Sequence, residues 1–142
     1  IASIYGLTAV ILGAFGAHAF KKILSVEKLQ SFETGVKYQM YSALFLLIVG
    51  YILKFESPSE KWIPILMILG TLFFSMSIYL LSFQEVWNTN LKFLGPVTPI
   101  GGLFMILSWA MLIFHFIKYL RLIFSKFQLR KSQKVSLKIY FL

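Results

Sequence analysis

Four long, predominantly apolar stretches constrain this chain more than any other feature. Each is almost free of charged residues, and Lys or Glu borders nearly every end. A helix that crosses a bilayer needs about 20 predominantly apolar residues, and each stretch meets or approaches that length. We therefore predict four membrane-spanning helices, at about residues 1–20, 38–55, 62–84 and 95–117.

The composition supports an all-α integral membrane four-helix bundle. Hydrophobic residues make up 58% of the chain and charged residues only 13%, against about 25% charged residues in a typical soluble domain. Helices satisfy their own backbone hydrogen bonds in lipid, whereas four strands could not close a barrel. The chain has no cysteine, which excludes disulfides and thiolate chemistry.

Most of the excess positive charge lies in a C-terminal tail. The chain carries a net charge of +9, and residues 118–142 hold seven basic groups and no acidic one. Leu120, Ile123, Phe124 and Phe127 share a helical face. We therefore divide the chain into a bundle, residues 1–117, and a basic amphipathic tail, residues 118–142. Such a tail is typical of membrane-surface binding, and we predict contacts with anionic lipid or a partner rather than with nucleic acid. The predicted contact residues are Arg121, Lys126, Arg130 and Lys131.

The first loop, residues 21–37, carries a helical pattern of its own. Ser25 is a suitable N-cap, and apolar residues recur at helical spacing from Val26 to Val36. We predict a short amphipathic helix on the membrane surface. The alternative is a soluble loop helix packed against the bundle.

The distribution of basic residues predicts the orientation. With four spans, both termini lie on one side together with Lys54 and Lys61, which brings nine basic residues to that side and five to the other. The positive-inside rule then places the termini in the cytoplasm, in a multi-pass protein of the cell inner membrane.

Small residues form a strip along the first span. The strip consists of Gly6, Ala9, Gly13 and Gly16. Helices in lipid associate by close backbone approach, so we expect this span to be the central packing helix, or the seam of a homo-oligomer. Ala17-His18-Ala19 has the form of a signal-peptidase site, but the length and glycine content of the stretch favour a retained span.

The fourth span opens with two prolines, Pro96 and Pro99. Proline is tolerated in the first helical turn, where backbone amides lack intrahelical partners. We therefore expect a continuous helix that begins near Gly95. The alternative is a discontinuous helix whose amide end faces an anionic ligand.

Few polar side chains stand out as site candidates. His18 is the only ionisable side chain within the first span, and an intramembrane titratable group is a functional candidate; a hydrogen-bonded interfacial histidine is the alternative. His115 is a weaker candidate. Gln39 is a candidate buried amide, and Glu33, Gln39 and His18 all border the first loop, so they could meet. No spacing supports a metal site or another cofactor.

Three segments together resemble the YgdD/YwdK family of small bacterial membrane proteins. They are Gly13-Ala14-Phe15-Gly16-Ala17-His18-Ala19, Tyr38-Gln39-Met40-Tyr41 and Gly95-Pro96-Val97-Thr98-Pro99-Ile100-Gly101-Gly102. Phe73-Phe74-Ser75-Met76-Ser77-Ile78-Tyr79 is similar to the family's third-helix pattern. The resemblance implies a four-helix inner-membrane protein of unknown function, and maps the family's polar motif positions onto His18 and Gln39. Ser42 stands where the family commonly has histidine, and the basic tail is a departure.

Three functions are compatible with these features. A structural or accessory subunit that associates with other membrane proteins or with itself fits the small-residue strip, the basic tail and the lack of a reaction centre. A small-molecule or proton transporter or channel, acting as an oligomer, is the alternative and would depend on His18 and Gln39. We predict no enzymatic activity, because the five acidic residues all lie in loops.

Overall fold

The computed structural model consists of four long helices that run up and down in chain order. They are α1 (Ala2–His18), α2 (Val26–Ile52), α3 (Pro58–Phe83) and α4 (Val97–Tyr140), with short 3-10 turns η1 (Phe20–Lys22) and η2 (Lys92–Leu94). The structure describes the backbone of residues 1–140 and the side chains of residues 1–128 and Arg130. All four helices contain stretches long and apolar enough to cross a membrane, as predicted.

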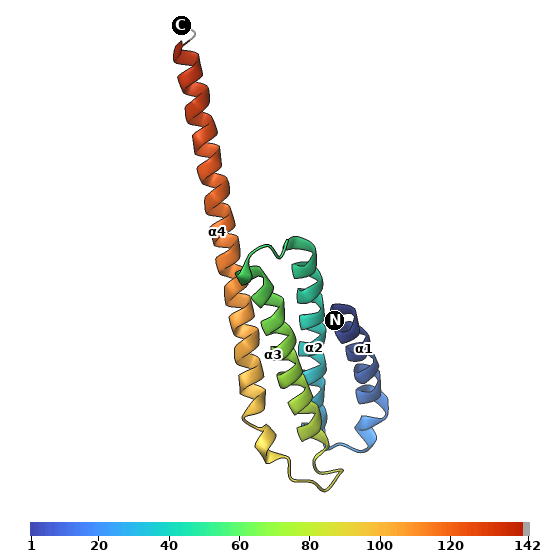
Figure 1. Ribbon diagram of the computed structural model, residues 1–142. Helices are drawn as coiled ribbons and strands as arrows, with labels where there is room; N and C mark the ends of the chain where they lie inside the picture. The colour runs from blue at the N-terminus through green and yellow to red at the C-terminus, as the bar shows by residue number, and fades with distance from the viewer. Residues whose placement is uncertain (141–142) are drawn as a thin grey trace.

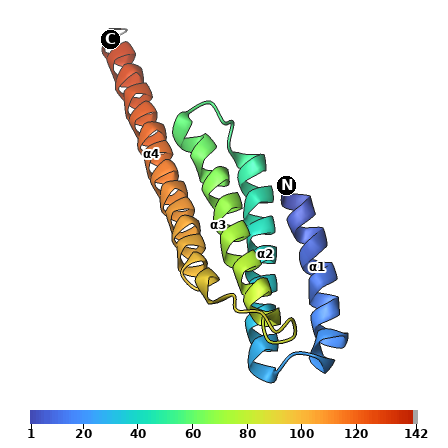
Figure 2. The same ribbon diagram turned by 60° about the horizontal axis from the view of Figure 1, so that its bottom comes forward.

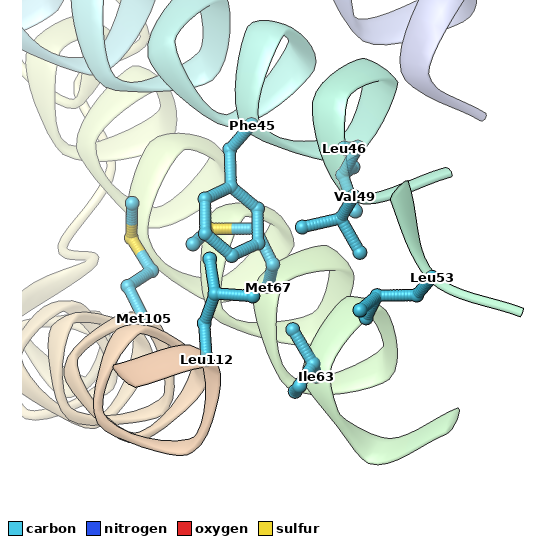
Figure 3. Close-up of a cluster of buried hydrophobic side chains, with 8 residues drawn as sticks. All are labelled: Phe45, Leu46, Val49, Leu53, Ile63, Met67, Met105 and Leu112. Atoms are coloured by element: carbon cyan, nitrogen blue, oxygen red, sulfur yellow. The ribbon is translucent and has the colours of Figure 1, made fainter. Parts of the chain in front are cut away.

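Each helix packs mainly on its neighbour in sequence, so the order across the bundle is α1, α2, α3, α4 (Figures 1 and 2). The main apolar core lies where α2, α3 and α4 meet, around Phe45, Met67 and Met105 (Figure 3). Phe45 and Trp109 join α2 to α4 across this core, with ring centroids 4.5 Å apart. The prediction of an all-α membrane bundle is therefore confirmed.

The first span is not the central helix. Among the helices, α1 packs closely only on α2, and Tyr5 reaches α3 through a 2.9 Å hydrogen bond to the Ile68 carbonyl oxygen. The inner positions belong to α2 and α3. α3 buries small and hydroxyl-bearing residues against both of its neighbours, whereas the strip of small residues on α1 lies on a single face and serves one neighbour. These residues are Gly70, Thr71, Ser75, Ser77 and Ser82.

The helix expected on the membrane surface is instead the first part of α2. Ser25 caps it, as predicted, by accepting a hydrogen bond from the Lys28 amide. Nothing breaks the helix before Tyr38, because Phe32 and Gly35 continue the face that packs on the bundle. Phe32 is 1% exposed and contacts the rings of Phe20 and Tyr79. Burial of this face, rather than the membrane surface, holds the segment.

α3 and α4 begin as their local sequences require. Ser57 accepts a hydrogen bond from the Glu60 amide and donates one to its carboxylate, and Pro58 occupies the first turn. The Glu60 carboxylate also accepts from the Glu56 amide, so this cap is a variant of the capping box. α4 begins at Val97, two residues after the predicted start near Gly95. Pro96 directly precedes the helix and Pro99 lies in its first turn, so α4 is continuous there.

The predicted tail continues α4 without a break. α4 spans 44 residues and extends beyond the loop that joins α2 to α3 (Figure 1). We call residues 118–130 the α4 extension. The remaining tail side chains, including that of Lys131, lie outside the described residues.

A buried polar cluster around Gln39

Gln39 lies on the face of α2 that packs against its neighbours. The buried positions of this helix follow spacings of three and four residues, as expected for one packed helical face; they include Phe32, Gly35, Gln39, Ser42, Leu46 and Val49. A carboxamide has two donor hydrogens and one acceptor oxygen. In the interior of a membrane bundle these groups need partners within the protein.

Side chains and backbone of α1 and α3 supply those partners. The Gln39 amide nitrogen donates to the Tyr5 carbonyl oxygen at 3.0 Å and to the Thr8 hydroxyl at 2.5 Å. The Gln39 carbonyl oxygen accepts a hydrogen bond from the Tyr79 hydroxyl at 2.8 Å. One side chain on α2 is therefore bonded to α1 on one side and to α3 on the other.

Neighbouring hydrogen bonds close the cluster. The Thr8 hydroxyl donates to the Ile4 carbonyl oxygen at 2.7 Å, and the Ser75 hydroxyl donates to the Gly35 carbonyl oxygen at 2.9 Å. Among the described residues, every buried side-chain nitrogen and oxygen atom has a partner. The cluster contains no carboxylate, imidazole or ammonium group. The cluster therefore joins α1, α2 and α3 by hydrogen bonds, and it contains no acid–base pair.

The structure does not bring Glu33, Gln39 and His18 together. α1 and α2 are antiparallel, and Gly16 lies level with Phe32 while Thr8 lies level with Gln39. His18 is therefore nearly three turns from Gln39 along the helix pair, and it is exposed at the end of α1. The Glu33 carboxylate lies 3.9 Å from the Lys37 ammonium group.

The remaining candidates divide into packing and surface positions. A methyl group added at Gly13 or Gly16 would lie 3.5 or 3.4 Å from Val36 or Phe32, respectively, so both glycines line the α1–α2 contact, as the small-residue strip indicated. Pro96 and Pro99 are exposed at the start of α4, and Arg121, Lys126 and Arg130 are exposed along the α4 extension. No group of three or more potential metal ligands occurs within the described part of the chain.

Sequence reasoning identified Gln39 but missed Tyr5, Thr8 and Tyr79, which complete its cluster. The available signal was weak. Tyr5 and Thr8 are spaced by three residues in an otherwise apolar span, and Tyr79 lies in a charge-free stretch. Tyrosine and threonine are common in membrane helices as interfacial or small packing residues, so their types alone do not indicate a shared partner.

Comparison with known proteins supports the resemblance. Residues 12–102 match the family described as "Protein of unknown function (DUF423)". A UPF0382 membrane protein of Staphylococcus haemolyticus is 41% identical over 113 residues, which cover 80% of this chain and 88% of the relative. No solved structure matches this chain.

Relatives also occur in other organisms. The UPF0382 membrane protein YwdK of Bacillus subtilis is 38% identical over 125 residues, covering 84% of this chain and 95% of the relative. A UPF0382 membrane protein of Schizosaccharomyces pombe is 35% identical over 111 residues, covering 78% and 92%. The family match and the relatives indicate the same family of membrane proteins, and the four apolar helices are consistent with it. The chain therefore belongs to the DUF423 family of membrane proteins.

Proposed function

We propose that this protein is a small accessory subunit that docks on a larger membrane complex through the α4 extension. The observation that carries this proposal is the exposure of an apolar stripe on that helix. Leu120, Ile123, Phe124 and Phe127 are each about half or more exposed, and Phe124 and Phe127 are each 63% exposed. These four residues, spaced as one helical face, are called the stripe below.

The geometry of α4 separates the stripe from the bundle. The His115 Nδ1 atom lies 4.0 Å from the Glu60 carboxylate in the first turn of α3, and α4 continues in a straight line beyond the α2–α3 loop (Figures 1 and 2). At 1.5 Å per residue, residues 118–140 form a rod about 34 Å long. We propose that the stripe extends beyond the bilayer and is covered there by a protein partner, because water does not solvate an apolar surface favourably.

The charges of the α4 extension indicate the chemistry of the partner. Arg121, Lys126 and Arg130 flank the stripe, and residues 118–142 contain no acidic residue. A second copy packed in parallel would bring like charges together, which is unfavourable. The partner therefore presents an apolar surface bordered by acidic residues. The buried polar atoms of the Gln39 cluster are already used in hydrogen bonds between helices. The proposed function therefore assigns the cluster a structural role and includes neither catalysis nor a cofactor.

Purification from native membranes in a mild detergent, with mass spectrometry of co-migrating proteins, tests the docking. We expect a stoichiometric partner with the native sequence, and loss of that partner when the four stripe residues are replaced with serine. A matched control, Ser125→Ala, changes the opposite side of the same helix and should retain the partner.

Two results would contradict the docking proposal. The native protein could migrate alone or only with copies of itself. Alternatively, the stripe variant could retain the partner while replacement of Arg121, Lys126 and Arg130 with glutamine abolishes binding to anionic vesicles. The second result would identify the lipid surface as the ligand of the α4 extension.

We also propose that the protein lies in the cell inner membrane with both termini in the cytoplasm. The N-terminus, the α2–α3 loop and the α4 extension share one end of the bundle (Figure 1). That end carries the larger number of basic residues, which favours a cytoplasmic location.

The absence of cysteine makes this topology directly testable. Ser59→Cys and Thr89→Cys each introduce a single exposed thiol, at opposite ends of the bundle. In intact cells, a membrane-impermeant maleimide should label the thiol at position 89 and not the one at position 59, whereas permeabilised cells should show both. The reverse pattern in intact cells would place the termini outside.

A further inference from the structure

A second surface feature lies where α4 leaves the bundle. A cavity of about 360 Å³ opens between the first turn of α3 and the adjoining part of α4. Its polar lining includes Ser57, Glu60, His115 and Lys118, and its apolar lining includes Met111 and Phe114. None of these residues takes part in the Gln39 cluster, although Ser57 and Glu60 also cap α3.

The cavity brings opposite charges together. The His115 Nδ1 atom lies 4.0 Å from a Glu60 carboxylate oxygen, and Lys118 lines the same cavity. Glu60 already accepts hydrogen bonds from the Ser57 hydroxyl at 2.8 Å and from the Glu56 amide at 3.2 Å. Each carboxylate oxygen has two lone pairs, so the group retains capacity for a further donor.

The surroundings place the cavity at the level of the lipid headgroups. Tyr119 lines the cavity and Trp62 lies close to it in sequence. Both are exposed, and such aromatic residues are enriched at the membrane–water interface. Met111 and Phe114 lie one to two turns before Lys118, which is toward the middle of the span. The cavity therefore has a polar, charged end at the interface and an apolar end in the hydrocarbon region.

We propose that this cavity binds the headgroup of an aminophospholipid, a lipid that carries a phosphodiester and a primary ammonium group. Lys118 and His115 donate to the phosphodiester oxygens, and the Glu60 carboxylate accepts from the ammonium group. An acyl chain follows Met111 and Phe114 into the bilayer. A lining with one carboxylate and neighbouring basic groups matches a zwitterion with a donor ammonium better than it matches a purely anionic headgroup.

The proposed lipid site is distinct from the stripe used for docking. The residues of α4 that line the cavity recur at spacings of three and four, as Met111, His115, Lys118 and Leu122. At 100° per residue, their face lies roughly opposite the stripe. The lipid and a protein partner can therefore bind at the same time, and loss of one does not imply loss of the other.

Native mass spectrometry of the full chain tests this site. The detergent-solubilised protein is equilibrated with equal amounts of phosphatidylethanolamine, phosphatidylglycerol and phosphatidylcholine, and the retained lipids are counted. We expect preferential retention of one phosphatidylethanolamine molecule. Lys118→Ala should weaken that binding about tenfold, because a charge-assisted hydrogen bond is lost. Lys54→Ala, an exposed lysine at the same end of the bundle that does not line the cavity, is the matched control and should leave it unchanged.

A second variant tests the role of the carboxylate. Glu60→Gln keeps the hydrogen bond from the residue-60 amide to the Ser57 hydroxyl and one side-chain acceptor oxygen, so α3 should remain folded. It should abolish the preference for phosphatidylethanolamine over phosphatidylglycerol.

Soluble glycerophosphoethanolamine should compete weakly, since it lacks the acyl chain. Equal retention of the three lipids by the native protein, or an unchanged preference in Glu60→Gln, would overturn the proposal. Equally strong competition by the soluble headgroup would mean that the cavity binds a water-soluble phosphodiester instead of a lipid.

Discussion

Replacing Gly101 with alanine should force α3 and α4 apart and lower the free energy of unfolding by about 3 kcal/mol, at the upper end for overpacked sites. A methyl group at this position would collide with the Phe74 amide nitrogen and would lie 2.7 Å from the Gly70 carbonyl oxygen. Both obstacles are backbone atoms of α3, so no side-chain rotation can relieve the contact. The helices must separate instead.

Separation would damage contacts along the whole interface. The Ser108 hydroxyl donates to the Ile63 carbonyl oxygen at 2.7 Å, and the Ser77 and Thr98 hydroxyls are 2.7 Å apart. In lipid, helix association depends on close packing and such hydrogen bonds, because the lipid tails are as apolar as the helix surfaces. The loss of stability in the Gly101→Ala protein should therefore exceed the cost of fitting in one methyl group alone.

Unfolding by SDS titration in mixed micelles, followed by tryptophan fluorescence, measures this effect. Gly102→Ala is the matched control, since a methyl group there would meet its nearest neighbour, the Phe74 ring, at 3.8 Å. That variant should be neutral or slightly stabilising, because alanine favours helix. Equal stability of the Gly101→Ala and Gly102→Ala proteins would show that α3 and α4 do not approach as closely as the structure indicates.

Replacing Gln39 with leucine should cost about 2 kcal/mol of stability. The substitution removes three hydrogen bonds, to Tyr5, Thr8 and Tyr79, and interhelical hydrogen bonds in membrane proteins contribute about 0.6 kcal/mol each on average. It also leaves the half-buried Tyr79 hydroxyl without its acceptor, which adds a desolvation cost. The same SDS titration reports the change.

A double-mutant cycle identifies the origin of the loss. Tyr79→Phe in the native background should destabilise the protein, whereas in the Gln39→Leu background it should have little effect, because the orphaned hydroxyl is removed. Gln30→Leu is the control on the same helix, where the side chain is exposed, and it should change stability little. Additive effects of the two cluster substitutions would contradict the hydrogen bond between Gln39 and Tyr79.

The individual elements could be predicted because their signals are local. The apolar stretches, the Ser25 cap and the prolines at the start of α4 all act within one helix or one turn, and the structure confirms them. The surface helix was the exception. An amphipathic pattern over residues 26–37 shows that one face is buried, but it does not show whether lipid headgroups or neighbouring helices bury it.

The sequence by itself determined that this chain enters a membrane as four helices, because the transfer of apolar residues into lipid is a sum over neighbouring residues. It also singled out Gln39 as a polar group that needs partners. Only the tertiary structure decided that α1 lies at the edge, that Tyr5, Thr8 and Tyr79 complete the Gln39 cluster, and that Gly101 meets the α3 backbone. These outcomes depend on which helix faces meet and at what register, and no local pattern in a single chain encodes that choice.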